Sequence, residues 1–214
     1  TLKLTQKQVV DIFLGTIKDW KQLGCAAGPV RVVHRSDGSG TTFAFTNSLS
    51  AFSSEWKSKV GEGKSVKWPV GIGGKGNEGV SGTVKTTPGS IGYVNTGFVK
   101  ANKLQAAAIQ NKAGQFVLPT AKSGAIALNS ITLDSNLAGE NPNPSASGAY
   151  PISTLTWVLA YKTGNGARKA SDIQKALNYA LSSKAQLIAD DLGYVPLAGS
   201  ILNKSRIAVK RIGQ

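Results

Sequence analysis

Methionine is missing from this sequence of 214 residues, and cysteine and histidine each occur once. Without a methionine the sequence does not start where translation starts, so we expect a processed product, a fragment or an incomplete record. The single Cys25 excludes an internal disulfide, and we expect it to be a small, buried or half-buried side chain. His34 has no second histidine to join it in a zinc site or a Ser-His-Asp triad, so we expect a buried or hydrogen-bonded structural role.

Long apolar runs and acidic residues are also scarce. No run approaches the roughly 20 residues that span a bilayer, and the sequence does not open with a charged-then-apolar signal peptide. Asp and Glu number 11 against 25 Lys and Arg, which gives a net charge of +14. Such a balance suits nucleic acid, an anionic membrane surface or small anionic ligands. The basic residues are spread along the chain, which is typical of a solvated surface.

Strand and helix patterns alternate along the chain, which indicates an α/β fold. Thr5 and Gln8 have the capping-box pattern, followed by a helical apolar face that should end near Gly15. A second capping box, at residues 171–174, predicts the start of a helix that includes Leu177 and Leu181. Apolar or alternating runs predict strands at residues 30–33, 66–70, 91–94 and 155–161.

The most informative segment, residues 35–42, joins the strand predicted at 30–33 to a helix with Phe45 on its apolar face. A glycine-bearing turn at a helix start leaves backbone N–H groups free, and Gly40 permits a close approach. Ser39 and Thr41 add hydroxyl donors, and Arg35 adds a fork of donors suited to an oxyanion, which Asp37 can orient. Residue types alone leave an anion-binding loop and an ordinary capped helix start both open.

Residues 71–76 fit the pattern G-x-G-x-x-G, but a dinucleotide site would also need an acidic residue about 20 positions later. No Asp or Glu lies between Glu78 and Asp134, and Lys75 is not followed by Ser or Thr as in a P-loop. We expect a structural loop near a cleft or lobe surface. The remaining acidic residues that could form a carboxylate pair are expected on solvated helices: Asp172, Asp190 and Asp191.

The order of motifs along nearly the whole chain resembles the periplasmic phosphate-binding proteins of the Pst ABC transporter (PstS-like proteins). The resemblance implies a two-lobed α/β clamp with the ligand between the lobes. Residues 1–150 match the second lobe, which carries half of the phosphate site, and residues 151–214 match the hinge crossing and the returning segment of the first lobe. The segments that carry the resemblance are 11–15, 19–20, 32–42, 66–71, 73–77, 90–94 and 150–153.

The same resemblance implies the roles of residues in the site. Arg35, Ser39, Gly40 and Thr41 match the residues that hold phosphate, and Asp37 matches the aspartate that pairs with the arginine. The family pattern begins upstream with a Gly-rich loop, and later a Ser and an Asp, that have no counterpart in this sequence. That Asp accepts a proton from phosphate and so excludes sulfate. We therefore expect weak phosphate binding that does not reject sulfate.

The function that the resemblance implies is capture of inorganic phosphate for the membrane permease of an ABC importer. It implies a binding protein and not an enzyme, with no cofactor, metal or nucleic acid, monomeric when complete, and periplasmic or at the cell surface. A phosphatase would need a metal cluster or nucleophile dyad that the sequence does not show. The alternative is a basic anion- or nucleic-acid-binding protein built on the same fold.

Overall fold

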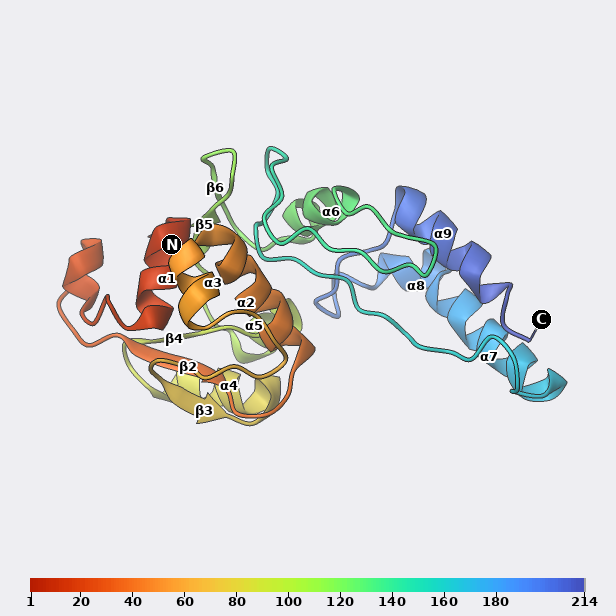
Figure 1. The fold of residues 1–214 in the computed structure, drawn as a ribbon, viewed down its shortest axis with the longest axis horizontal. Coiled ribbons are helices and arrows are strands. Elements are labelled where there is room, and N and C mark those ends of the chain that lie inside the picture. The colour runs from red at the N-terminus through yellow and green to blue at the C-terminus, as the bar shows by residue number, and fades with distance from the viewer. Residues whose placement is uncertain (214) are drawn as a thin grey trace.

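Residues 1–213 are described by a computed structural model, in which two groups of elements lie along the long axis (Figure 1). The first group holds the strands and helices α1 to α5, and the second holds α6 to α9. None of the helices in residues 1–213 combines the length and the hydropathy of a membrane-spanning segment. The strands are β1 (Lys3–Leu4), β2 (Arg31–Arg35), β3 (Ile72–Gly74), β4 (Ser90–Gly92), β5 (Ala108–Gln110) and β6 (Phe116–Val117). The helices are α1 (Gln6–Leu14), the 3-10 helix η1 (Trp20–Leu23), α2 (Gly40–Phe52), α3 (Ser54–Lys59), α4 (Gly76–Thr86), α5 (Thr96–Asn102), α6 (Ala121–Asn129), α7 (Ala167–Ala180), α8 (Ser183–Leu187) and α9 (Gly199–Val209).

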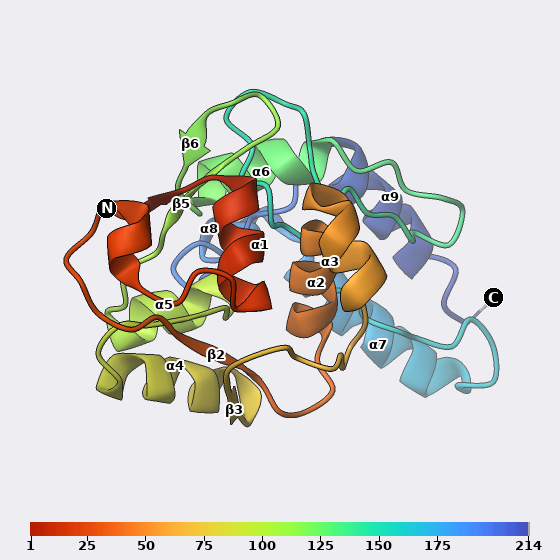
Figure 2. The same cartoon turned by 60° about the vertical axis from the view of Figure 1, so that its left-hand side comes forward.

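The main sheet is parallel, with strand order β3-β2-β4, so β2 lies in the middle. Helix α4 packs on one face, and α1 and α2 lie over the other (Figure 2). Successive side chains of a strand point to opposite faces, and Val32 and Val33 of β2 are both buried. Coverage on both faces is what a parallel sheet requires. Because the three strands are parallel, their carboxyl ends lie at one shared edge of the sheet.

Aromatic rings fill the core between this sheet and α1 to α3. Phe13 meets Phe45 edge-on, with ring centroids 4.7 Å apart. Full burial of a side chain of this size contributes roughly 1.5–3 kcal/mol. His34 stacks on Trp68 with centroids 4.9 Å apart, and its Nδ1 lies 3.0 Å from the carbonyl oxygen of Arg35. The structural role predicted for His34 is therefore confirmed.

Local signals set the ends of α1 as predicted. The Thr5 side chain accepts the N–H of Gln8, and the Gln8 side chain accepts the N–H of Thr5, which completes the capping box. Gly15 ends the helix with a positive φ of 76°, a conformation that glycine adopts without strain. The predicted helix after residue 40 is also present, but Ser53 divides it into α2 and α3 by capping α3.

The second group has its own apolar cluster, formed by buried side chains of residues 128–133 with Leu155 and Ile201. This cluster joins side chains from before and after position 150. The lobe boundary that the sequence predicts between residues 150 and 151 stays a prediction. Helix α5 joins the two groups, because the Thr96 hydroxyl donates to the carbonyl oxygen of Gly193 and Lys100 pairs with Asp190.

The prediction of a strand at residues 66–70 is wrong. The strand beside β2 is β3, which begins two residues after that range ends. Pro69 has no N–H for a sheet ladder, and Trp68 packs into the aromatic core instead. β3 contains mostly glycine, so its pairing with residues 33–35 of β2 outweighs its poor strand propensity.

Two other local predictions are wrong in the second group. Residues 155–161 form no strand, because no strand among residues 1–213 lies beside them to pair with. Helix α7 starts at Ala167 and not at Ser171, because good helix formers extend it back to Gly166. Cys25 is exposed in the turn after η1, against the expectation of a buried or half-buried side chain.

Candidate functional site

The loop after β2, residues 36–39, lies at the carboxyl edge of the main sheet, beside the segments that follow β3 and β4. Ligands of open α/β sheets bind outside this edge, where the strand order changes direction. The chain runs from β2 to β3 on one side and then crosses to β4 on the other, so β2 marks that change. The predicted site residues therefore lie where this fold favours a ligand.

Arg35 and Asp37 form the ion pair that the sequence predicts. Arg35 Nε donates to Asp37 Oδ1 at 2.8 Å, and Arg35 Nη2 donates to Asp37 Oδ2 at 2.6 Å. The Arg35 side chain is 10% exposed and that of Asp37 is 36% exposed. The hydrogen bond from Arg35, together with one from the Gly76 backbone, holds the pKa of Asp37 well below its ordinary range. Arg35 Nη1 has no partner among residues 1–213 and remains available to an anion.

Asp37 also ties the loop to the start of α4, because its Oδ1 accepts the N–H of Gly76 at 3.0 Å. The carboxylate thus lies at the positive end of that helix. Strand β3 in turn packs closely on α4 at Gly74, where an added Cβ would come within 2.7 Å of the Val80 nitrogen. The segment 71–76 therefore contributes to the site through its backbone.

Ser39 is the N-cap of α2. Its Oγ accepts the N–H of Thr41 at 3.1 Å and that of Thr42 at 3.3 Å, and the side chain is buried. The capped helix start, one of the alternatives left open above, is therefore present. It does not exclude an anion, because Gly40 is exposed and its N–H, at the first helical position, has no helical partner. The Ser39 hydroxyl also keeps its proton free to donate.

A buried tyrosine links the end of β2 to the first turn of α2. Tyr93 OH accepts the backbone N–H of Arg35 at 3.1 Å and lies 2.8 Å from Thr42 Oγ1. Its ring stacks on Phe45 with centroids 4.4 Å apart, and burial raises the pKa of its hydroxyl. Tyr93 therefore fixes Arg35 relative to the helix start.

Thr41 contacts the segment after β4. Its Oγ1 donates to Asn95 Oδ1 at 2.8 Å, and the Asn95 backbone N–H donates to Asn77 Oδ1 at 3.3 Å. The loops after β2, β3 and β4 are thus joined by hydrogen bonds on both sides of Arg35.

Sequence reasoning missed Gly76, Tyr93 and Asn95. Each follows, or lies at the end of, a strand that neighbours β2. The rule that ligands gather at the carboxyl edge of a parallel sheet could have found Asn95, since a strand was predicted directly before it.

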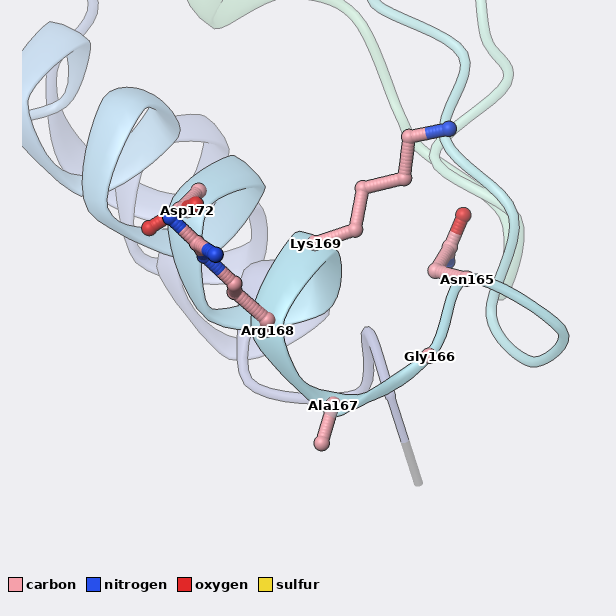
Figure 3. A pocket seen from close by; sticks show the side chains of 6 residues that line it. All are labelled: Asn165, Gly166, Ala167, Arg168, Lys169 and Asp172. Atoms are coloured by element: carbon pink, nitrogen blue, oxygen red, sulfur yellow. The ribbon is translucent and has the colours of Figure 1, made fainter.

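A hollow of about 450 Å³ lies elsewhere, at the start of α7 (Figure 3). It includes none of the loop residues described above. The residues that line it are Asn165, Gly166, Ala167, Arg168, Lys169 and Asp172. Asp172, Asp190 and Asp191 are exposed, as predicted, but only Asp172 lies on a helix, α7, because Asp190 and Asp191 are in the turn after α8. Within residues 1–213, no group of three or more His, Cys, Asp or Glu side chains is placed to hold a metal ion.

Comparison with known sequences places this chain in a family. Residues 1–184 match the family described as the PBP superfamily domain. A Xylella fastidiosa protein named phosphate-binding protein PstS is 41% identical over 216 residues, covering 95% of this chain and 58% of that protein. The Haemophilus influenzae protein of the same name is 39% identical, covering 94% of this chain and 64% of that protein. The chain thus spans about three-fifths of the length of these curated relatives.

Solved structures agree on the fold. A structure titled as a DING protein superposes with a TM-score of 0.72 at 19% identity, covering 95% of this chain and 65% of that chain. A second structure, titled as a high affinity periplasmic phosphate-binding protein bound with phosphate, gives a TM-score of 0.69 at 19% identity. It covers 100% of this chain and 71% of that chain. The two-lobed α/β fold implied by the sequence is confirmed.

Proposed function

The chain belongs to the PBP superfamily, and on that basis we propose that it captures inorganic phosphate for an ABC-type importer. The observation that carries the proposal is Arg35, clamped by Asp37 beside the exposed start of α2 with Nη1 unpaired. The curated relatives bear the name phosphate-binding protein, which supports a binding protein and not an enzyme.

Each predicted site residue has a role in this proposal. Arg35 donates to phosphate from Nη1, and the Ser39 and Thr41 hydroxyls and the Gly40 N–H donate from the start of α2. Asp37 does not touch the ligand but holds the guanidinium in place, because it engages both Nε and Nη2. The positive end of α2 adds a favourable field for the anion.

The wider assignment follows from the family. We propose that residues 1–150 are the second lobe of a clamp and that residues 151–214 cross the hinge and return to the first lobe. Its membrane partner is the permease of the importer, to which the complete, monomeric protein delivers phosphate. Its location is the periplasm or the cell surface.

Titration calorimetry with inorganic phosphate tests the proposal. Arg35→Lys keeps the charge but loses the planar fork of donors. A hydrogen bond to a charged group contributes about 1.5–3 kcal/mol, so we expect a loss of affinity of about 10- to 100-fold. Arg31→Lys is the matched control, because Arg31 lies on the same strand, is exposed and hydrogen-bonds to Pro88 away from the loop. Equal losses in the two variants, or no binding at millimolar phosphate, would overturn the proposal.

Selectivity against sulfate is a separate question for the same assay. Phosphate differs from sulfate at neutral pH by carrying a proton, so a site prefers phosphate when it offers a free acceptor. Asp37 is the carboxylate of the loop, and Arg35 and Gly76 already occupy it. We therefore expect sulfate to compete with phosphate for these 214 residues. Tight phosphate binding that sulfate cannot displace would show that an acceptor outside the loop completes the site.

The net charge of +14 supports a second candidate, a basic anion- or nucleic-acid-binding protein. Binding to nucleic acid falls steeply with salt because counterions are released. A site built on aimed N–H groups loses much less. Titration of mixed-sequence duplex DNA and of phosphate at low and high salt separates the two candidates.

A further inference from the structure

Asn95 contacts the candidate phosphate site from a segment 54 residues away in the sequence. Its Oδ1 accepts the hydrogen bond from Thr41 Oγ1 at 2.8 Å. Thr41 is one of the proposed phosphate ligands, so the state of this hydrogen bond decides where the Thr41 proton points.

The Asn95 side chain is not used by its own helix. Asn95 is the N-cap residue of α5, but its side chain makes no capping hydrogen bond. The backbone of Asn95 is instead held by Asn77, which accepts its N–H. Asn95 Nδ2 has no hydrogen-bond partner among residues 1–213, so the amide is free to turn about its last torsion.

The chemistry of the Thr41–Asn95 pair depends on a single proton. A threonine hydroxyl has one proton to donate. While that proton is donated to Asn95 Oδ1, Thr41 presents only the lone pairs of its oxygen to an anion, and these lone pairs repel the anion. To bind phosphate, Thr41 must turn its proton away from Asn95. An asparagine can then rotate its amide and donate Nδ2–H to Thr41 Oγ1, whereas a carboxylate cannot.

We propose that Asn95 is a positioning residue of the phosphate site. Its Oδ1 accepts the hydrogen bond from Thr41 when the site is empty, and its Nδ2 donates a hydrogen bond to Thr41 Oγ1 when phosphate is bound. A hydroxyl that accepts one hydrogen bond while donating another is a stronger donor. This inference rests on the proposed function and adds to it a residue that never contacts the ligand.

The test is a double-mutant cycle in phosphate titration calorimetry. Asn95→Asp keeps the acceptor but removes the donor, so it holds the Thr41 proton away from the ligand. We expect phosphate affinity to fall about 10- to 100-fold. Combined with Thr41→Val, which has no proton to hold, Asn95→Asp should cost only the part due to charge repulsion. Melting temperatures of all variants should stay close to one another, because the pair is exposed.

Asn77→Asp is the control for charge alone. It adds the same negative charge on the neighbouring segment and still accepts the Asn95 N–H. We expect its effect on affinity to be the same with and without Thr41→Val. If Asn95→Asp also costs the same factor in both backgrounds, repulsion explains everything and the positioning role is wrong. If the unmutated chain binds no phosphate, the proposed function itself fails, which is a different result.

Discussion

Tyr93→Phe removes one oxygen atom from the buried junction beneath the candidate loop. The tyrosine is 8% exposed, and its ring stacking on Phe45 should survive the change. What is lost is the acceptor for the backbone N–H of Arg35 and the partner of Thr42 Oγ1. Phenylalanine fills the same space but offers neither a donor nor an acceptor.

The magnitude follows from the donor left behind. A buried N–H without an acceptor costs about 1–3 kcal/mol. For a chain of this size, each kcal/mol lowers Tm by about 2–4 °C. We therefore expect Tyr93→Phe to lower Tm by about 2–12 °C.

Differential scanning calorimetry at equal protein concentration measures this change. Tyr161→Phe is the matched control, because Tyr161 is 83% exposed and its hydroxyl makes no hydrogen bond among residues 1–213. The control should leave Tm unchanged within about 1 °C, as surface substitutions usually do. A Tyr93→Phe melt that coincides with the control would refute the role of Tyr93 as the anchor of Arg35.

Three further perturbations test the site and the surface. Asp37→Asn should weaken phosphate binding by loosening Arg35, and tighter binding would mean that charge repulsion dominates. Because the pKa of Asp37 is lowered in the folded state, the ionised side chain stabilises the fold, and this contribution is lost as pH falls below the ordinary pKa of 3.8. The free energy of unfolding of Asp37→Asn should therefore decrease less on acidification than that of the unmutated chain. Gly74→Ala should destabilise the chain, because its Cβ meets backbone of α4, whereas Gly82→Ala, with open space at that position, should stabilise it by about 0.5–1 kcal/mol in thermal melts. Leu159, 94% exposed in a segment outside any helix or strand, should favour self-association; Leu159→Lys should reduce it in sedimentation velocity, and unchanged association would place the contact elsewhere.

Residues 5–52 are the part of the fold that local patterns predict best. The capping box at Thr5, the stop at Gly15 and the glycine-bearing turn before α2 each act within a few residues. Local propensity and tertiary packing agree there, so pattern reasoning placed these elements correctly. The Arg35–Asp37 pair belongs to the same class, because its members are two residues apart.

The errors and omissions involve contacts between distant residues. Tyr93 meets Arg35 across 58 positions, and no local pattern encodes that contact. Residues 155–161 have the alternation of a strand, but a strand also needs a partner beside it. At β3, pairing with β2 selected a glycine-rich segment that propensity disfavours. Strand propensity is a property of one segment, whereas the formation of a sheet depends on hydrogen bonds between several segments.

Helix α5 contacts both groups of elements. The residue before it reaches Thr41, while its Thr96 and Lys100 bond to the turn at residues 190–193. If phosphate binding turns the Asn95 amide, the change starts at one end of a helix whose other contacts lie in the second group. Comparing hydrogen exchange at the amides of residues 190–193 with and without phosphate measures this, and identical exchange would show that the two ends are independent. Coupling free energies are reciprocal. If exchange at that turn does change with phosphate, a ligand that binds the turn must alter phosphate affinity by the same factor by which phosphate alters the affinity for that ligand, and the remote turn would then report site occupancy.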